Sequence, residues 1–172
     1  MDKRWLIIII TLFVGLCCLY VIVDNSTSVG KGIVSVDRVI MTLPPGFTNF
    51  QKHGDTVSVE NKYGGEKLYF ESIERGNHSL EAYHNKTNSL KELGTVEITK
   101  NVTLQFGDIK AHTIYYHNTE RNNNSEYIAS YFDKFNNTFG VTVWNFKDTE
   151  QGESFIKFVI ETLYEDYKKP PE

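Results

Sequence analysis

The chain has 172 residues, of which 40% are hydrophobic and 23% are charged. Two of the 18 basic and one of the 22 acidic residues precede the first apolar run, which leaves 16 basic and 21 acidic residues in the remainder. This acidic balance argues against a nucleic acid as partner, because binding to phosphates needs a basic surface. The length suits one globular domain of about 140 residues behind an N-terminal segment.

Both cysteines, Cys17 and Cys18, lie inside the N-terminal apolar run. The predicted domain therefore has no disulfide framework, no thiolate metal site and no cysteine nucleophile.

Residues 5–23 form an uncharged, apolar run of 19 residues. As a helix this run would be about 28 Å long, close to the thickness of the hydrocarbon core of a bilayer. Lys3 and Arg4 precede it, so we expect residues 1–4 to stay in the cytoplasm and the rest to be exported. The sequence predicts a single-pass anchor in the cell membrane, with the lipid bilayer as its partner.

A cleaved signal peptide is the competing interpretation of this run. Such a peptide has a shorter apolar core of about 7–15 residues and ends in a small-x-small site. Here the run is longer, and residues 26–28 offer the one weak cleavage candidate. Trp5 and Tyr20 lie near its two ends, where amphipathic rings favour the membrane interface. In both cases the domain is exported.

Asparagine-x-serine/threonine sequons are in excess over the roughly two expected by chance. They are the possible N-glycosylation sites Asn25, Asn77, Asn85, Asn101, Asn123 and Asn136. A glycan requires an exposed, exported asparagine, so these sequons favour a domain outside the cytoplasm. Asparagine-rich loops also generate sequons without any modification, and that alternative stays open.

The domain begins after a polar tether, residues 24–35. A strand is predicted over residues 36–43, and the sequence Pro44-Pro45-Gly46 ends it. Phe47 and Phe50 follow as predicted core residues.

The next predicted elements are a hairpin and a helix. Residues 56–60 alternate apolar and polar side chains, residues 63–66 carry a hairpin signal, and a strand follows at 67–74. Three- and four-residue spacing of Leu80, Tyr83, Thr87 and Leu90 predicts a helix over 79–93.

Four strands and a closing helix complete the pattern. The strands are predicted at 95–104, 109–117, 126–135 and 139–146, and the polar loop 118–125 joins the second to the third. In the first of them Val96, Ile98, Val102 and Leu104 are expected on one face. Asp148 and Gln151 resemble a capping box that starts a helix over 149–167.

The predicted order is βββ-α-ββββ-α over a domain of residues 36–168, with a tail at 169–172. Runs of strands with two separated helices predict an α+β fold, an antiparallel sheet covered by two helices as an α/β/α sandwich.

Three features together resemble the Mog1/PsbP-like fold. A first strand runs into Leu43-Pro44-Pro45-Gly46-Phe47, Gly107 precedes a long strand, and an aromatic hairpin leads into a closing amphipathic helix. The resemblance covers residues 36–167 and includes small exported or membrane-anchored prokaryotic domains of this group. It implies a non-enzymatic module that binds or assembles other proteins. No binding residue carries over, because members use different surfaces.

No pattern of titratable residues selects a catalytic or metal site. His112 and His117 are five residues apart on a predicted strand, so they face opposite sides of the sheet. No tight ligand spacing, nucleophile elbow or phosphate-binding loop is present in the sequence. We therefore predict no catalytic residues, no metal and no cofactor.

Aromatic residues concentrate in the predicted strands of the second half. Because neighbours on a strand alternate, both faces of the sheet are expected to carry rings. One face is core, and the other either lies under a helix or forms an exposed binding surface. The candidate surface is Tyr115, Tyr116, Tyr131 and Trp144.

The sequence thus predicts a membrane-anchored, extracytoplasmic interaction or envelope-assembly module, non-catalytic, with a protein partner of unknown identity. The alternatives are a small envelope hydrolase and a carbohydrate-binding surface domain.

Overall fold

The computed structural model describes residues 13–15, 33–36, 39–119 and 126–165. The predicted anchor, residues 5–23, lies outside this set apart from the helical residues 13–15. Among the described residues, no helix has both the length and the apolar character that crossing a bilayer requires.

Ten strands and two longer helices make up the domain. In chain order they are β1 (Ile33–Val36), β2 (Val39–Thr42), β3 (Phe47–His53), β4 (Thr56–Asn61), β5 (Lys67–Arg75), α2 (Ser79–Glu92), β6 (Val96–Phe106), β7 (Ile109–Asn118), β8 (Glu126–Lys134), β9 (Asn137–Trp144), α3 (Thr149–Thr162) and β10 (Tyr164–Glu165).

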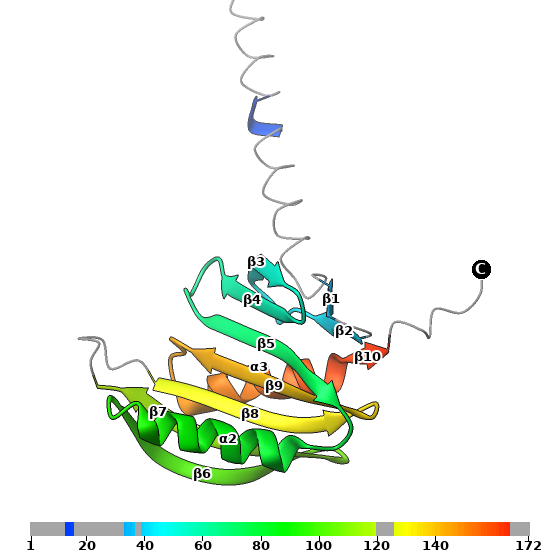
Figure 1. Ribbon diagram of the computed structural model, residues 1–172. Helices are drawn as coiled ribbons and strands as arrows, with labels where there is room; N and C mark the ends of the chain where they lie inside the picture. The colour runs from blue at the N-terminus through cyan, green and yellow to red at the C-terminus, as the bar shows by residue number, and fades with distance from the viewer. Residues whose placement is uncertain (1–12, 16–32, 37–38, 120–125, 166–172) are drawn as a thin grey trace, which may run out of the picture.

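The strands form two antiparallel sheets. The larger sheet has the order β3-β4-β5-β9-β8-β7-β6, and the smaller has the order β1-β2-β10. Helix α2 packs on one face of the larger sheet and α3 on the other (Figure 1). The predicted α+β class with an antiparallel sheet is therefore confirmed.

The α3 face of the larger sheet is covered by α3 and by the small sheet. Buried side chains of α3 pack on β7, β8 and β9, and those of the small sheet pack on β4 and β5. Three fully buried rings lie at the centre: Phe70, Phe132 and Phe139. The ring centroid of Phe139 is 5.6 Å from that of Phe70 and 5.7 Å from that of Phe132. Rings packed at this distance contribute attraction beyond the area they bury.

The opposite face, which carries α2, is only half covered. A 14-residue helix is about 21 Å long and 10 Å wide, whereas seven strands span about 29 Å. Accordingly α2 contacts β6, β7, β8 and β9. On the same face of the sheet, β4 and β5 carry half-exposed residues. We call these the open half-face: Thr56, Ser58, Glu60, Lys67, Tyr69 and Glu71.

Two predicted elements at the start of the domain were wrong. The strand expected at 36–43 is instead a hairpin, because Val36 pairs with Val39 and the charged residues 37–38 separate two short strands. Its first strand begins at Ile33, inside the predicted tether. Strand β3 was not predicted, because its polar residues do not alternate with apolar ones.

The prediction for β6 was wrong about its faces. A β-bulge interrupts the pairing with β7 between Ile98 and Lys100, and such a bulge inserts one extra residue that reverses the alternation. Val96 and Ile98 therefore pack under α2, whereas Val102 packs toward α3.

The closing helix is shorter than predicted. It ends at Thr162, and Leu163 has the extended angles φ −65° and ψ 129°. Tyr164 and Glu165 then pair with Ile40 and Val39 of β2. Pairing with β2 replaces the helical turn that the sequence pattern favoured.

Adjacent residues of β8 cap both helices. The Asp133 carboxylate accepts hydrogen bonds from Ser79 N at 3.0 Å and Ser79 Oγ at 2.5 Å, at the start of α2. Lys134 Nζ donates to the carbonyls of Ile160 and Leu163 at 2.6 and 2.8 Å, at the end of α3. Each charge has the sign that the helix dipole favours at that end. Helix α2 has no side-chain cap from its own N-cap residue, His78, and α3 has no basic residue in its last turn.

Candidate functional site

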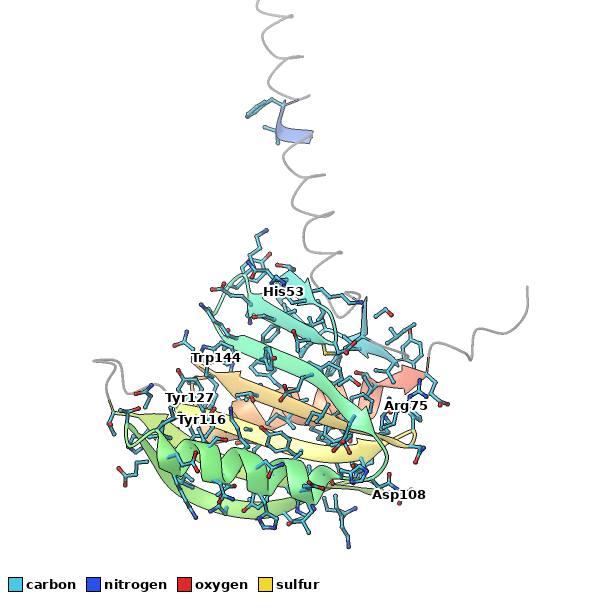
Figure 2. The ribbon with its side chains drawn as sticks, viewed as in Figure 1. His53, Arg75, Asp108, Tyr116, Tyr127 and Trp144 are labelled. Atoms are coloured by element: carbon cyan, nitrogen blue, oxygen red, sulfur yellow. The ribbon has the colours of Figure 1, made fainter. Side chains whose placement is uncertain are left out.

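One end of the larger sheet gathers aromatic and charged side chains. Here β7 ends, β8 begins, β9 ends and α3 begins, so loops and strand ends meet at this edge. Tyr116, Tyr127 and Trp144 are cross-strand partners on β7, β8 and β9. Their rings stack in a row, with centroids 5.0 and 5.9 Å apart and interplanar angles of 8° and 25° (Figure 2).

The geometry of this stack limits what it can bind. Tyr127 has a ring on each side, whereas Trp144, at the end of the row, stacks through one face. A sugar packs its C–H groups on a free ring face, because that face carries the negative side of the quadrupole. The stack therefore does not favour a carbohydrate platform.

The four predicted aromatic residues do not form one exposed surface. Tyr115 is buried on the α3 face, whereas Tyr116 and Tyr131 are buried under α2. Trp144 alone among them is half-exposed. Alternation along β7, which the sequence pattern already indicated, places Tyr115 and Tyr116 on opposite faces of the sheet. Helix α2 covers Tyr116 and Tyr131. Tyr127, which was not singled out, is the half-exposed neighbour of Trp144.

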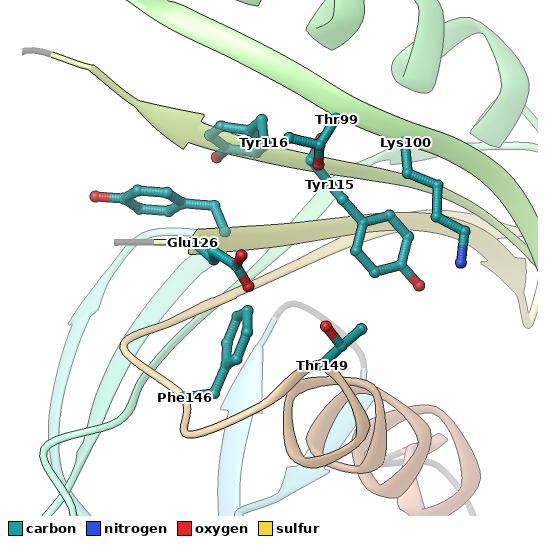
Figure 3. Close-up of a pocket in the computed structure, with 8 residues that line it drawn as sticks. Thr99, Lys100, Tyr115, Tyr116, Glu126, Phe146 and Thr149 are labelled. Atoms are coloured by element: carbon teal, nitrogen blue, oxygen red, sulfur yellow. The ribbon is translucent and has the colours of Figure 1, made fainter. Parts of the chain in front are cut away.

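A pocket of about 190 Å³ opens at the same end, between the sheet and the start of α3. Eight residues line it: Thr99, Lys100, Tyr115, Tyr116, Glu126, Tyr127, Phe146 and Thr149 (Figure 3). The bulge at Thr99 places Lys100 in register with Tyr115, and the ammonium lies 4.9 Å from the ring centroid of Tyr115. Phe146 packs against Gly152, where an added Cβ would lie 3.0 Å from its Cδ1.

Tyr115 is a hydrogen-bond donor in this pocket. Its hydroxyl donates to Glu153 Oε1 at 2.5 Å. Burial raises the pKa of the Tyr115 hydroxyl, and the hydrogen bond to Glu153 and its negative charge raise it further. The hydroxyl therefore stays protonated at neutral pH, and it cannot serve as a general base.

A second group of titratable residues lies on the open half-face beside α2. A Cβ at Gly140 would lie 2.7 Å from Glu71 Oε1 and 3.1 Å from the Tyr131 ring, so the missing side chain gives the Glu71 carboxylate its place. Burial raises the pKa of Glu71 above its ordinary value of 4.5, although Lys86 and Tyr69 oppose this shift. Burial and the charge of Glu71 also raise the pKa of Tyr69.

This environment of Glu71 predicts a pH dependence of stability. Because its pKa is raised in the folded state, the folded protein holds this proton more tightly than the unfolded chain. Stability from this group is therefore lost as the pH rises from about 4.5 through the raised pKa. We expect Glu71→Gln to remove that loss, so that the variant is at least as stable as the parent protein at pH 7. Urea unfolding of both proteins between pH 4 and 7 measures this difference in stability.

Glu92→Gln, on the exposed side of α2, is the matched control and should leave the pH profile of the parent protein unchanged. Equal pH profiles for Glu71→Gln and Glu92→Gln would show that Glu71 does not carry the effect.

The histidines do not assemble a metal centre. Within the described ranges, no group of three or more histidine, cysteine, aspartate or glutamate side chains has metal-binding geometry. Burial lowers the pKa of His112, against the attraction of Asp133, and its Nδ1 lies 3.2 Å from Thr103 Oγ1. His117 pairs instead with Glu97 at 3.1 Å.

The sequon asparagines within the described residues are all exposed. These are Asn77, Asn85, Asn101 and Asn136. Asn25 and Asn123 lie outside the described residues.

Comparison with known proteins identifies the fold but finds no close relative. No family model matches the chain, and no curated protein matches it. The chain is similar to the solution structure of cyanobacterial PsbP (CyanoP) from Synechocystis sp. PCC 6803, with 14% identity and a TM-score of 0.50, over 80% of this chain and 96% of that one. The fold is PsbP-like.

A crystal structure from Bacteroides thetaiotaomicron VPI-5482 has the same TM-score, 0.50, at 13% identity. The match covers 84% of this chain, which spans about half the length of that protein, 51%. Both similarities concern the PsbP-like fold alone, because at these identities function does not follow from fold. The predicted resemblance to the Mog1/PsbP-like fold is confirmed at that level.

Proposed function

We propose that the chain is a non-catalytic interaction module, held at the outer side of the cell membrane by residues 5–23, and that it binds a partner protein through the open half-face. The observation that carries this proposal is the half-covered sheet. The α3 face is closed by a helix and a second sheet, whereas α2 leaves the outer side of β4 and β5 uncovered.

The composition of this surface suits a protein partner. Tyr69 contributes aromatic area, and the Lys67–Glu60 pair, 3.9 Å apart, contributes charges of both signs. Trp144, opposite Lys67, and Tyr127, opposite Trp144, add half-exposed rings beside this surface. Tyrosine and tryptophan are enriched in protein interfaces, where polar groups surround them. Glycan binding has less support, because stacking engages both faces of Tyr127 and one face of Trp144.

Membrane tethering explains how a small surface would suffice. Two strands by six residues give about 200 Å² in plan, below the roughly 800 Å² per partner of a stable complex. Binding through this area alone would be weak. Two proteins held in one membrane meet at a high effective concentration, which strengthens weak contacts without new ones.

A hydrolase has little support from the described residues. The pocket is smaller than the roughly 300–1,000 Å³ of usual ligand sites. The Tyr115 hydroxyl in it already donates a hydrogen bond to Glu153. Covalent catalysis needs a nucleophile within reach of a base.

The orientation in the membrane rests on the basic residues before the apolar run and on the exposed sequons. A cysteine at Ser154, exposed on α3, should react with a membrane-impermeant maleimide in intact cells. Labelling only after lysis would place the domain inside and overturn this part of the proposal.

Cross-linking tests the partner. A photoreactive residue at Ser58, on the open half-face, should yield a discrete cross-linked protein in native membranes, identified by mass spectrometry. The matched control at Ser154 should not yield that product. Recovery of no reproducible protein from Ser58, or of the same proteins from both positions, would contradict the proposed surface.

A further inference from the structure

The pocket at the start of α3 has the character of a cation site. Glu126, the first residue of β8, directs its carboxylate into the space between the rings of Tyr115 and Phe146 (Figure 3). Carboxylate and aromatic faces together attract a positive group, because the ring face and the carboxylate are both negative.

The chain already contains one example of this attraction. Lys100 comes from the neighbouring strand and holds its ammonium 4.9 Å from the ring centroid of Tyr115. This contact shows that the ring accepts a primary ammonium in the geometry of a cation–π interaction.

The surrounding charges disfavour an anion. Lys100 and Glu126 balance one another in the lining, and Glu153 lies directly behind on the Tyr115 hydroxyl. Asp148 and Glu150 add two more exposed carboxylates at the start of α3. These four carboxylates outweigh Lys100, the exposed Lys147 and the weak positive end of the helix dipole.

The size of the pocket selects the end of one side chain. Its volume of about 190 Å³ is below the roughly 300–1,000 Å³ of usual small-molecule sites. That space accommodates an ammonium or guanidinium group with part of its stem, but not a larger organic ligand.

The position in the fold favours a protein as the source of the cation. The chain enters the domain at β1, which contacts β4, whereas the pocket lies at β6, β7 and β8. From β4 to β6 the sheet extends over five strand spacings, about 24 Å. A domain tethered at β1 therefore has its attachment about 24 Å across the sheet from this pocket.

We propose that the pocket receives a lysine or arginine side chain of a partner protein, with Glu126 as its ion partner and Tyr115 and Phe146 as its aromatic walls. This inference rests on the proposed function and specifies the chemistry of the partner. The partner presents a basic residue to the pocket, which opens at the same end of the sheet as Tyr127 and Trp144.

Titration of the full chain in detergent micelles tests the site. The probes are N-acetyl-lysine methylamide, the uncharged N-acetyl-norleucine methylamide and the acidic N-acetyl-glutamate methylamide. The lysine probe should shift the amide resonances of Tyr115 and Thr149 in a saturable manner, at least about tenfold more tightly than the norleucine probe, because the charge-assisted contact is lost in the latter. Equal affinity for the two, or tighter binding of the acidic probe, would overturn the assignment.

Matched variants locate the effect. Glu126→Gln should weaken the lysine probe at least about tenfold, whereas Glu74→Gln removes the same charge from an exposed residue that does not line the pocket and should change affinity less than twofold. Equal losses would show a diffuse field rather than a site. Displacement of the lysine probe by phosphatidylethanolamine vesicles, but not by phosphatidylglycerol vesicles, would replace the protein by a lipid headgroup and overturn the proposal.

The two proposals fail separately. Absence of lysine binding together with a cross-linked partner at Ser58 would remove the cation pocket and leave the interaction module. Lysine binding without any cross-linked partner would leave the cation pocket and remove the interaction module.

Discussion

Replacing Asp133 with alanine is expected to destabilise the domain by about 2–4 kcal/mol, because one carboxylate caps a helix and joins it to the sheet. It accepts hydrogen bonds from Ser79 N, Ser79 Oγ and Thr138 Oγ1, at 3.0, 2.5 and 2.7 Å. Ser79 is buried, so its N–H and hydroxyl would both lose this acceptor, whereas the Thr138 hydroxyl keeps the Gly76 carbonyl at 3.3 Å. Urea unfolding of the full chain measures the difference.

Asp108, exposed in the turn between β6 and β7, gives the control. Asp108→Ala should change stability by less than about 0.5 kcal/mol, as surface substitutions usually do. The loss in Asp133→Ala should also appear as faster amide exchange in α2. An exchange rate equal to that of the parent protein would mean that the cap is not needed.

Phe139→Ala is expected to cost about 3–5 kcal/mol, the range for deleting a buried phenylalanine ring. Its ring is fully buried between Phe70 and Phe132, and it lies on β9, the middle strand of the larger sheet's order. Truncation would leave a cavity that the two neighbouring rings can fill only in part. The midpoint of denaturant unfolding reports this loss.

Two further variants bracket the effect. Phe139→Leu keeps most of the volume and should cost less than the alanine variant. Tyr63→Ala, at a side chain 63% exposed, should stay within about 0.5 kcal/mol. A small loss for Phe139→Ala would contradict the assignment of the three rings to the centre of the core.

Local patterns predicted much of the fold. The helix predicted at 79–93 is α2, Ser79–Glu92, and β4 and β5 before it follow apolar alternation. Asp148 caps α3 by accepting from Gln151 N at 2.9 Å, as the capping-box pattern indicated. These features depend on residues close in sequence, which is why the sequence alone predicts them.

Features that depend on tertiary contacts were not predictable. The bulge at residues 98–100 leaves no mark in composition, yet it decides which side chains of β6 face α3. The caps from Asp133 and Lys134 come from another element, so no local pattern at either helix end reveals them. Pairing of Tyr164 with Ile40 likewise needs the small sheet.

The candidate sites followed the same division. The sequence indicated that aromatic residues concentrate in β7, β8 and β9, but their burial depends on where the two helices pack. Tyr116 and Tyr131 are buried under α2 and Tyr115 on the α3 face, whereas Trp144 is half-exposed. Lys100, Glu126 and Phe146 are distant in sequence and meet only where three strand ends and a helix start converge. A bulge and a strand end, rather than a motif, assemble that pocket.

The small sheet also makes the chain suitable for circular permutation. Its order β1-β2-β10 places the first and last strands of the domain on either side of β2, with Val36 and Glu165 both opposite Val39. Two strand spacings and three residues of rise separate Ile33 from Glu165 by about 14 Å. A linker of about five residues would therefore join them, and new ends at the exposed Gly107–Asp108 turn would leave every strand of both sheets uncut.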